Sequence, residues 1–161
     1  MSELPKSAQK VADAAGAAGL AVTVLEMPDS TRTADEAAAA CQCTVGQIVK
    51  SLIFRGRDTD TPYLFLVSGA NRVDEKGVAA HLGEKLKRPD ANDVRALTGY
   101  AIGGIPPIGH DAPLATYMDE DLIAFDVVWA AAGTPRCVFS VDPKALEQAT
   151  GAHVLGVKKP A

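Results

Sequence analysis

The sequence contains no long hydrophobic run. No stretch approaches the roughly 20 consecutive apolar residues that a membrane-spanning helix needs. The first residues, MSELPK, also lack the basic and then apolar profile of a secretory signal. These absences predict a cytoplasmic protein that does not contact the membrane.

Cysteine is scarce, with Cys41, Cys43 and Cys137 as the three examples. An odd, small number of cysteines without an export signal argues against a disulfide framework. The Cys41-Gln42-Cys43 pair has no further Cys or His at the spacing of metal ligands, and the three histidines form no HxxxH or HExxH pattern. We therefore expect neither a metal ion nor another cofactor.

Several catalytic motifs are also missing. The chain has no GxSxG elbow, no Walker loop and no GxGxxG after a strand. No sequence pattern indicates a particular cysteine and histidine as a catalytic pair. The net charge of −4, from 16 basic and 20 acidic residues, argues against a general nucleic-acid binder. It still allows an enzyme that touches only the end of an RNA through a local basic patch.

The composition fits one compact domain over residues 1–161. Apolar residues make up 47% of the chain and charged residues 22%, which is ordinary for a protein with a core. Short helical and strand signals alternate along the sequence. This alternation predicts an α/β or α+β fold around one mixed sheet.

Caps and periodicity place the predicted elements. Thr33 and Thr44 each open a capping box, and Asp142 precedes a proline at the first helical position. Helices are predicted over residues 7–19, 34–40, 74–82, 91–98 and 143–151, with a short helical turn after Thr44. Strands are predicted over 22–27, 51–55, 63–68, 85–88, 127–131, 137–141 and 154–157, with 51–55 and 63–68 forming a hairpin.

The densest glycine and proline stretch of the chain, residues 99–113, is the first candidate site. Gly103 and Gly104 allow close approach by a ligand and leave backbone N–H groups free, while Pro106 and Pro107 fix where those groups point. Such a loop can polarise an ester carbonyl. The spacing alone is more typical of a structural turn between strands.

Lys50 is the second candidate, because it precedes the apolar strand 51–55. A lysine there suits a cleft in which it holds a phosphate or a polar substrate, although it could also extend along the surface.

The polar loop 68–72 follows another apolar strand and could bind a ligand or simply turn the chain. The basic cluster Lys85, Lys87 and Arg88, with Arg95 nearby, could meet an RNA backbone or form a solvated strand face.

Together these segments resemble the YbaK/ProX family of free-standing aminoacyl-tRNA editing deacylases, which is related to the editing insertion of bacterial prolyl-tRNA synthetases. The matching segments run in order over nearly the whole chain: residues 30–34, 45–52, 64–72, 97–110 and 128–135. The resemblance implies a curved, partly barrel-like mixed sheet surrounded by short helices. It also implies that the chain removes a noncognate amino acid from tRNA after the synthetase has released it.

The resemblance also implies the site. The family's essential lysine falls on Lys50, and its GxxxP loop falls on residues 103–107, so Lys50, Gly103 and Gly104 are the expected catalytic residues. The expected substrate-binding residues are Thr31, Ser68, Asn71, Ile105, Pro106, Pro107, His110 and Gly133. Two departures matter. Residues 32–33 lack the tyrosine found there in some relatives, and residues 133–135 depart from the Gly-Lys-Arg turn of the cysteine-removing branch.

The expected mechanism needs no side-chain nucleophile. Amides of the 103–107 loop would hold the aminoacyl carbonyl, Lys50 would hold the terminal adenosine or its phosphate, and water would attack with help from the neighbouring ribose hydroxyl. The expected partners are the 3′ end of mischarged tRNA, taken as tRNA-Pro carrying Ala, Cys, Ser, Thr or 2-aminobutyrate, and a synthetase such as prolyl-tRNA synthetase. Two alternatives are a non-catalytic tRNA- or nucleotide-binding module and a hydrolase of free aminoacyl esters.

Overall fold

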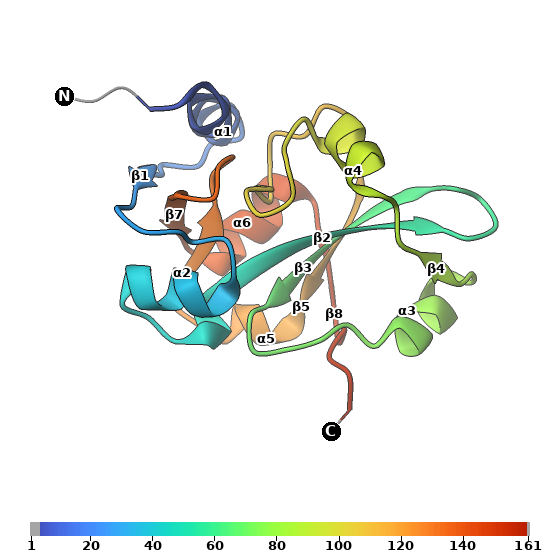
Figure 1. The fold of residues 1–161 in the computed structure, drawn as a ribbon. Coiled ribbons are helices and arrows are strands. Elements are labelled where there is room, and N and C mark those ends of the chain that lie inside the picture. Colours follow the sequence, from blue (N-terminus) through green and yellow to red (C-terminus); the bar gives the residue numbers. More distant parts are fainter. Residues whose placement is uncertain (1–3, 161) are drawn as a thin grey trace.

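A computed structural model describes residues 4–160 of the chain (Figure 1). Its helices are α1 (Lys6–Ala17), α2 (Ala34–Cys41), the 3-10 helix η1 (Val45–Gln47), α3 (Glu75–Leu82), α4 (Ala91–Thr98), α5 (Glu120–Ile123) and α6 (Pro143–Thr150). Its strands are β1 (Leu25–Glu26), β2 (Ile48–Gly56), β3 (Pro62–Ser68), β4 (Leu86–Lys87), β5 (Ala115–Asp119), β6 (Val128–Ala131), β7 (Cys137–Val141) and β8 (His153–Leu155).

The strands form one mixed sheet that does not close, and this confirms the predicted fold class. The strand order is β1-β7-β6-β2-β3-β5-β8, with β4 paired to β2 outside this path. The pairs β2–β6, β3–β5 and β5–β8 are parallel, and the others are antiparallel. The predicted hairpin is confirmed as β2 and β3, with Lys50 opposite Val67.

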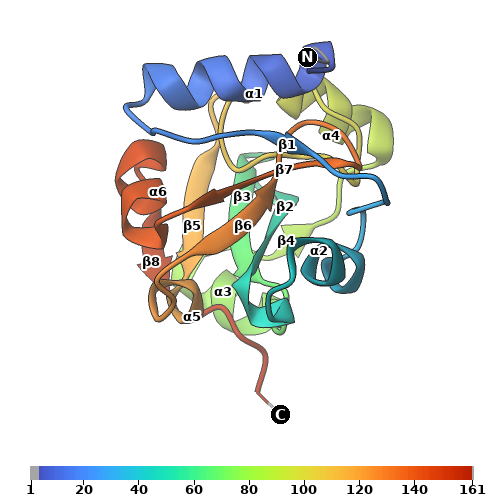
Figure 2. The same cartoon turned by 90° about the vertical axis from the view of Figure 1, so that its left-hand side faces the viewer.

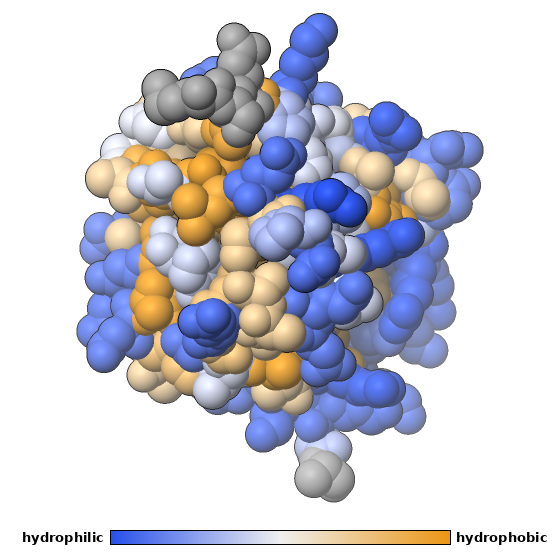
Figure 3. Space-filling view, turned by 60° about the vertical axis from the view of Figure 1, so that its left-hand side comes forward, coloured by the Kyte–Doolittle hydropathy of each residue, from blue (hydrophilic) through white to orange (hydrophobic). Residues whose placement is uncertain are grey.

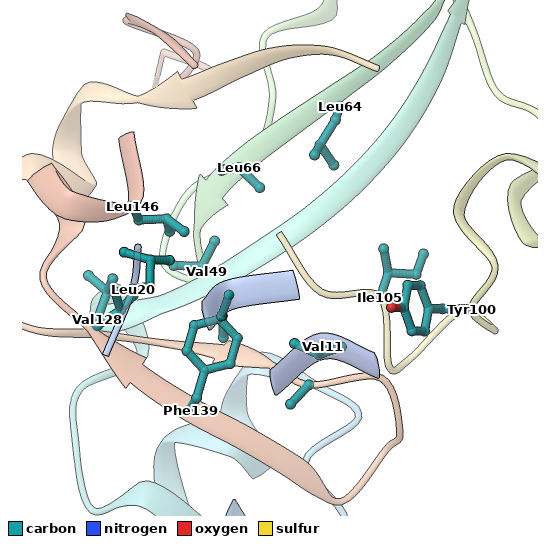
Figure 4. Packing of buried hydrophobic residues seen from close by; sticks show 14 of the residues in the cluster. Val11, Leu20, Val49, Leu64, Leu66, Tyr100, Ile105, Val128, Phe139 and Leu146 are labelled. Atoms are coloured by element: carbon teal, nitrogen blue, oxygen red, sulfur yellow. The ribbon is translucent and has the colours of Figure 1, made fainter. Parts of the chain in front are cut away.

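β3 is buried on both faces because it lies at the centre of the sheet. Leu64 and Leu66 point into the main core, and Phe65 and Val67 point into a second cluster on the other face. In Figure 2, α1 lies across one end of the sheet and α6 covers its side. Figure 4 shows how the main core gathers side chains from α1, the strands and the 99–111 loop, where Ile105 lies beside Tyr100.

The helix ends follow the capping signals. The Thr33 hydroxyl accepts a hydrogen bond from the Glu36 amide, and the Glu36 carboxylate accepts one from the Thr33 amide in return. Gly83, Gly99 and Gly151 end their helices in the left-handed conformation. The boxes at residues 33–36 and 44–47 are therefore confirmed.

Several predicted boundaries were wrong. The strand predicted over 22–27 is reduced to β1 and the one over 85–88 to β4. The strand predicted over 154–157 is shifted to β8, and the first helix ends at Ala17. β2 begins at Ile48, so Lys50 lies inside the strand. No element was predicted between residues 114 and 126, where β5 and α5 lie.

β2 has strand partners on both edges only near its two ends. β3 occupies one edge from Val49 to Arg55. On the other edge β6 pairs with residues 48–49 and β4 with residues 55–56. Among residues 4–160, no strand covers that edge between Lys50 and Phe54.

No helix within the described residues is both long and apolar enough to cross a membrane. On the face shown in Figure 3, hydrophobic residues form small patches interrupted by hydrophilic ones. Among residues 4–160, Ile102 is the most exposed large hydrophobic residue, at 51%. It lies beside the cavity described next.

Candidate active site

A cavity of about 350 Å³ opens against the uncovered edge of β2. Its walls come from the segment leading into α2, from β2, β6 and β7, and from the loop after α4. The lining residues are Thr31, Arg32, Thr33, Ala34, Ala37, Ile48, Val49, Lys50, Ser51, Leu52, Ile102, Gly103, Ile105, Trp129, Ala130, Ala131 and Val138. These include two cations and no carboxylate, so the cavity suits an anionic or carbonyl group.

Lys50 is held in place by a backbone carbonyl. Its ammonium group donates a hydrogen bond to the Asn71 carbonyl oxygen. The Asn71 side-chain amide in turn donates to Asp119 at 2.8 Å and to Asp121 at 2.7 Å, and Asp119 also accepts from the Ser68 amide. These bonds fix the position of the carbonyl and, through it, of the ammonium group.

The surroundings of Lys50 disfavour its charged form. Burial lowers the pKa of Lys50, and the positive charge of Arg72 lowers it further, against the opposing effect of Asp119. An anion bound in the cavity would offset both effects. The site is therefore electrostatically prepared for a phosphate or a developing oxyanion.

Two amides of the 103–105 segment are available to a ligand. Across residues 4–160, neither the Gly103 nor the Ile105 N–H has a hydrogen-bond acceptor, whereas the Gly104 N–H donates to the Ala101 carbonyl at 3.1 Å. Gly103 adopts φ +101°, and a Cβ there would come within 2.9 Å of Arg32 Cγ. In this conformation Gly103 and Ile105 are the available donors, and Gly104 holds the turn.

The loop is braced on several sides. Gly104 accepts a hydrogen bond from the Gly133 amide at 2.9 Å, the Tyr100 hydroxyl donates to the Gly109 carbonyl at 3.0 Å, and His110 Nε2 lies 2.7 Å from the Pro106 carbonyl oxygen. Burial lowers the pKa of His110, which favours the neutral ring. A neutral ring with its proton on Nε2 would donate to Pro106 and keep the loop in place.

The residues expected from the sequence fall into two groups. Lys50, Gly103, Ile105 and Thr31 line the cavity together, and Thr31 is anchored by its hydroxyl, which donates to the Pro135 carbonyl at 2.9 Å. The residues outside the lining are Gly104, Ser68, Asn71, Pro106, Pro107, His110 and Gly133. Except for Pro107, these residues make hydrogen bonds that hold Lys50 or the loop in position.

Several lining residues were not nominated from the sequence. Arg32 reaches across to Gly103, while Trp129 and Ile102 form walls. Ser51 contributes a buried hydroxyl that has no hydrogen-bond partner in the described chain. All four residues lie within the matching segments, but a serine in an apolar strand gives no signal of its own.

No group of three or more His, Cys, Asp or Glu side chains within residues 4–160 is placed to hold a metal ion. Cys41 ends α2, and Gln42 after it adopts a left-handed conformation. Burial raises the pKa of the Cys41 thiol to about 11, with a smaller effect from Cys43. This favours the protonated thiol, which is a poor nucleophile.

Comparison with known proteins agrees with this arrangement. The model of the aminoacyl-tRNA editing domain family matches residues 28–149. A solved structure provisionally assigned as a trans-editing enzyme for prolyl-tRNA synthetase is 48% identical and superposes with a TM-score of 0.92, covering 98% of this chain and 100% of that chain.

Two curated relatives show the same likeness. The uncharacterized protein YwhH of Bacillus subtilis is 31% identical over 78% of this chain and 79% of its own length. EbsC of Enterococcus faecalis, provisionally assigned as a Cys-tRNA(Pro)/Cys-tRNA(Cys) deacylase, is 28% identical over 71% of this chain and 70% of its own. The chain therefore belongs to the aminoacyl-tRNA editing domain family, and its reaction is the deacylation of mischarged tRNA.

Proposed function

We propose that residues 1–161 act as one editing domain that deacylates tRNA-Pro in trans, with Lys50 and the amides of Gly103 and Ile105 as its working groups. One observation carries this proposal: a single cavity is lined by Lys50 and by Gly103 and Ile105, whose amides have no hydrogen-bond acceptor among residues 4–160. The assigned substrate of EbsC and the assigned role of the solved relative support tRNA-Pro as the acceptor.

Lys50 binds the phosphate of the terminal adenosine. A half-buried ammonium group close to Arg72 gains more from an anion than an exposed lysine would, because the anion offsets both burial and repulsion. Fixing this phosphate places the adjacent ribose and its aminoacyl ester against the 103–105 segment. Lys50 therefore contributes to the reaction rate by orienting the ester.

The loop amides stabilise the transition state. Water adds to the ester carbonyl carbon, and the charge that develops on the carbonyl oxygen accepts hydrogen bonds from Gly103 and Ile105. The bond between the carbonyl carbon and the ribose oxygen then breaks, and that oxygen takes up the proton that the water loses. Each such donor is worth about 10²–10³ in rate.

Several small side chains line the cavity. The wall contains Ala34, Ala37, Ala130, Ala131 and Val138. A wall of this kind selects by size, and one methylene is worth about 1–3 kcal/mol. It favours alanine and 2-aminobutyrate over the polar candidates, serine and threonine, because it offers their hydroxyl groups no new partner.

The test compares Lys50→Ala with Lys144→Ala, which removes an exposed lysine of α6 far from the cavity lining. The substrates are tRNAs charged with alanine, cysteine, serine, threonine or 2-aminobutyrate. We expect Lys50→Ala to lower kcat/KM on mischarged tRNA-Pro by about 10²-fold or more while circular dichroism shows an intact fold. Lys144→Ala should match the wild type.

The same panel separates the alternatives. A binding module would retain tRNA without releasing amino acid, and an esterase would act equally on free aminoacyl esters. Near-normal turnover by a folded Lys50→Ala protein would remove Lys50 from the mechanism. Because the substrate is a product of aminoacylation, we also propose that the chain acts in the cytoplasm beside prolyl-tRNA synthetase or another synthetase.

A further inference from the structure

A second cavity, of about 470 Å³, adjoins the first along β2. Both cavities are lined by Lys50, Ser51, Leu52, Ile102 and Ile105. The two cavities therefore meet at these residues, which include Lys50 and the exposed Ile102. A chain-like ligand anchored at Lys50 can extend from one cavity into the other.

Three further cations line the second cavity. Arg72 and Lys159 come from distant parts of the sequence, and the Lys159 amide donates to the Arg72 carbonyl at 2.7 Å, which keeps the two residues together. Arg88 is the one member of the predicted basic cluster that lines the cavity. Lys87, its neighbour, instead pairs with Asp60 at 2.8 Å.

The apolar part of this cavity suits a flat group. Leu52, Phe54, Pro89, Val94 and Ile102 contribute to its lining. The Arg88 guanidinium lies 5.8 Å from the centroid of the Phe54 ring, so a planar cation is already held against an aromatic ring there. Nucleobases stack on such surfaces, and guanidinium groups add to the stacking.

The charge of the second cavity is opposite to that of the whole chain. Its lining holds Lys50, Arg72, Arg88 and Lys159 against a single carboxylate, Glu75, which is paired with Arg88 at 3.2 Å. The chain as a whole carries −4. A local positive site of this kind attracts one part of a polyanion, and the protein does not need to bind the rest of that molecule.

We propose that the second cavity binds the unpaired nucleotides that precede the terminal adenosine of the tRNA, with their phosphates on Arg72, Arg88 and Lys159 and a base on the apolar lining. This inference rests on the proposed function, because it needs the aminoacyl end in the first cavity. An acidic peptide would satisfy the cations equally well, but it would not use the flat apolar lining or continue into the editing cavity.

The test neutralises these three cations together, as Arg72→Gln, Arg88→Gln and Lys159→Gln. The matched control carries Arg57→Gln, Arg136→Gln and Lys144→Gln, which make the same change in net charge at exposed positions outside both cavities. Removing Arg72 also removes one cause of the lowered Lys50 pKa. A loss of function in the triple variant would therefore not come from deprotonation of Lys50.

The first readout is binding of a fluorescent, unacylated single-stranded RNA ending in ACCA, measured against salt concentration. Each phosphate contact in a single strand contributes about 0.7 to the slope of log K against log salt. In the triple variant, we expect the magnitude of this slope to fall by about 2 and the affinity at 0.1 M salt to fall by about 10²-fold. The control should bind as the wild type does.

The second readout is kcat/KM on mischarged tRNA, which we expect to fall in the triple variant through KM. Equal RNA binding and equal KM in the triple variant and its control would overturn the inference, as would equally weakened binding of an acidic peptide of the same charge. A wild type that binds the RNA through these cations without deacylating tRNA would refute the proposed function and leave this RNA site standing.

Discussion

Ser51 is a lining residue of both cavities. It lies between Lys50 and Leu52 on β2, and its Oγ is buried without a hydrogen-bond partner among residues 4–160. A buried hydroxyl in this state costs about 1–3 kcal/mol. The cost is understandable if the group bonds to the ribose or to the attacking water when the substrate is present.

Ser51→Ala is expected to separate stability from activity. Removal of the unsatisfied hydroxyl should leave the free energy of unfolding unchanged or raise it by about 1 kcal/mol. kcat/KM for deacylation should fall, because one contact with the bound substrate or water is lost. Ser140→Ala, which removes a half-buried hydroxyl from β7, serves as control for both urea unfolding and activity. Equal turnover by the two variants would leave the Ser51 hydroxyl without a part in the reaction.

Residue chemistry explains which parts of the site could be predicted. Lys50 stands out because a cation between apolar residues at the start of a predicted strand needs a reason, and the Gly103-Gly104 pair stands out because of its conformational freedom. Ser51 and Trp129 do not stand out, because serine and tryptophan are common in strands. The division of roles between the Gly103 and Gly104 amides depends on one hydrogen bond to Ala101, which no sequence pattern encodes.

The loop after α4 works as a rigid element although it has no regular secondary structure. Gly104 packs against the backbone of Thr134 in the turn between β6 and β7, where a Cβ would lie 2.8 Å from the Thr134 Cα and N atoms. Those atoms are backbone and do not move aside easily. The turn therefore sets the distance between the loop amides and β2.

Gly104→Ala is expected to shift the loop away from this turn. We expect kcat/KM to fall by about 10²-fold, because a displacement of about 1 Å in the oxyanion donors is sufficient for such a loss. The cost in stability should be about 1–3 kcal/mol.

Gly16→Ala is the matched control for Gly104→Ala. Gly16 is an exposed residue of α1 with open space around its Cα, so the added methyl group should stabilise the helix by about 0.5–1 kcal/mol. Activity should remain that of the wild type. Thermal unfolding and deacylation rates check both variants. A fully active Gly104→Ala protein would show that the contact between Gly104 and Thr134 does not position the loop amides.

Helices with strong end signals and the strands β6 and β7 were predicted well, whereas β5 was missed. The predicted helix over 91–98 coincides with α4 because an Asp cap and a terminal glycine delimit it. β5 was missed because its sequence, ATYMD, is short and mixes polar with apolar residues. It forms a strand because β3 and β8 pair with it on either side, so its conformation depends on tertiary contacts and not on local sequence.

The stability of the whole molecule should depend on a carboxylate far from the site. Glu84 accepts hydrogen bonds from the amides of Asp58 and Thr59 and from the hydroxyls of Thr59 and Tyr63, and so ties the end of the β2–β3 hairpin to the segment before β4. These bonds lower the pKa of Glu84 from 4.5 to about 2, with the Thr59 hydroxyl as the largest cause. The ionised form is therefore the one that stabilises the fold.

The expected pH dependence follows from the sign of this shift. The contribution of Glu84 is fully present above pH 4.5 and is lost as the pH falls toward 2, because the unfolded chain takes up the proton first. Glu84→Gln should therefore be less stable than the wild type at neutral pH and approach it near pH 2. Urea unfolding between pH 2 and 7 measures the difference, and a constant gap across this range would contradict the assignment.

The uncovered edge of β2 limits which substitutions this protein can tolerate near its site. A strand edge without a partner can pair with another chain and start aggregation, so natural proteins cover or charge such edges. Here the segment 102–105 lines the same cavity as that edge and also supplies the amides proposed to bind the substrate. Variation that loosened this segment would threaten solubility together with turnover. New amino-acid preferences should therefore arise more readily on the opposite wall, in α2 and β6, than in the loop itself.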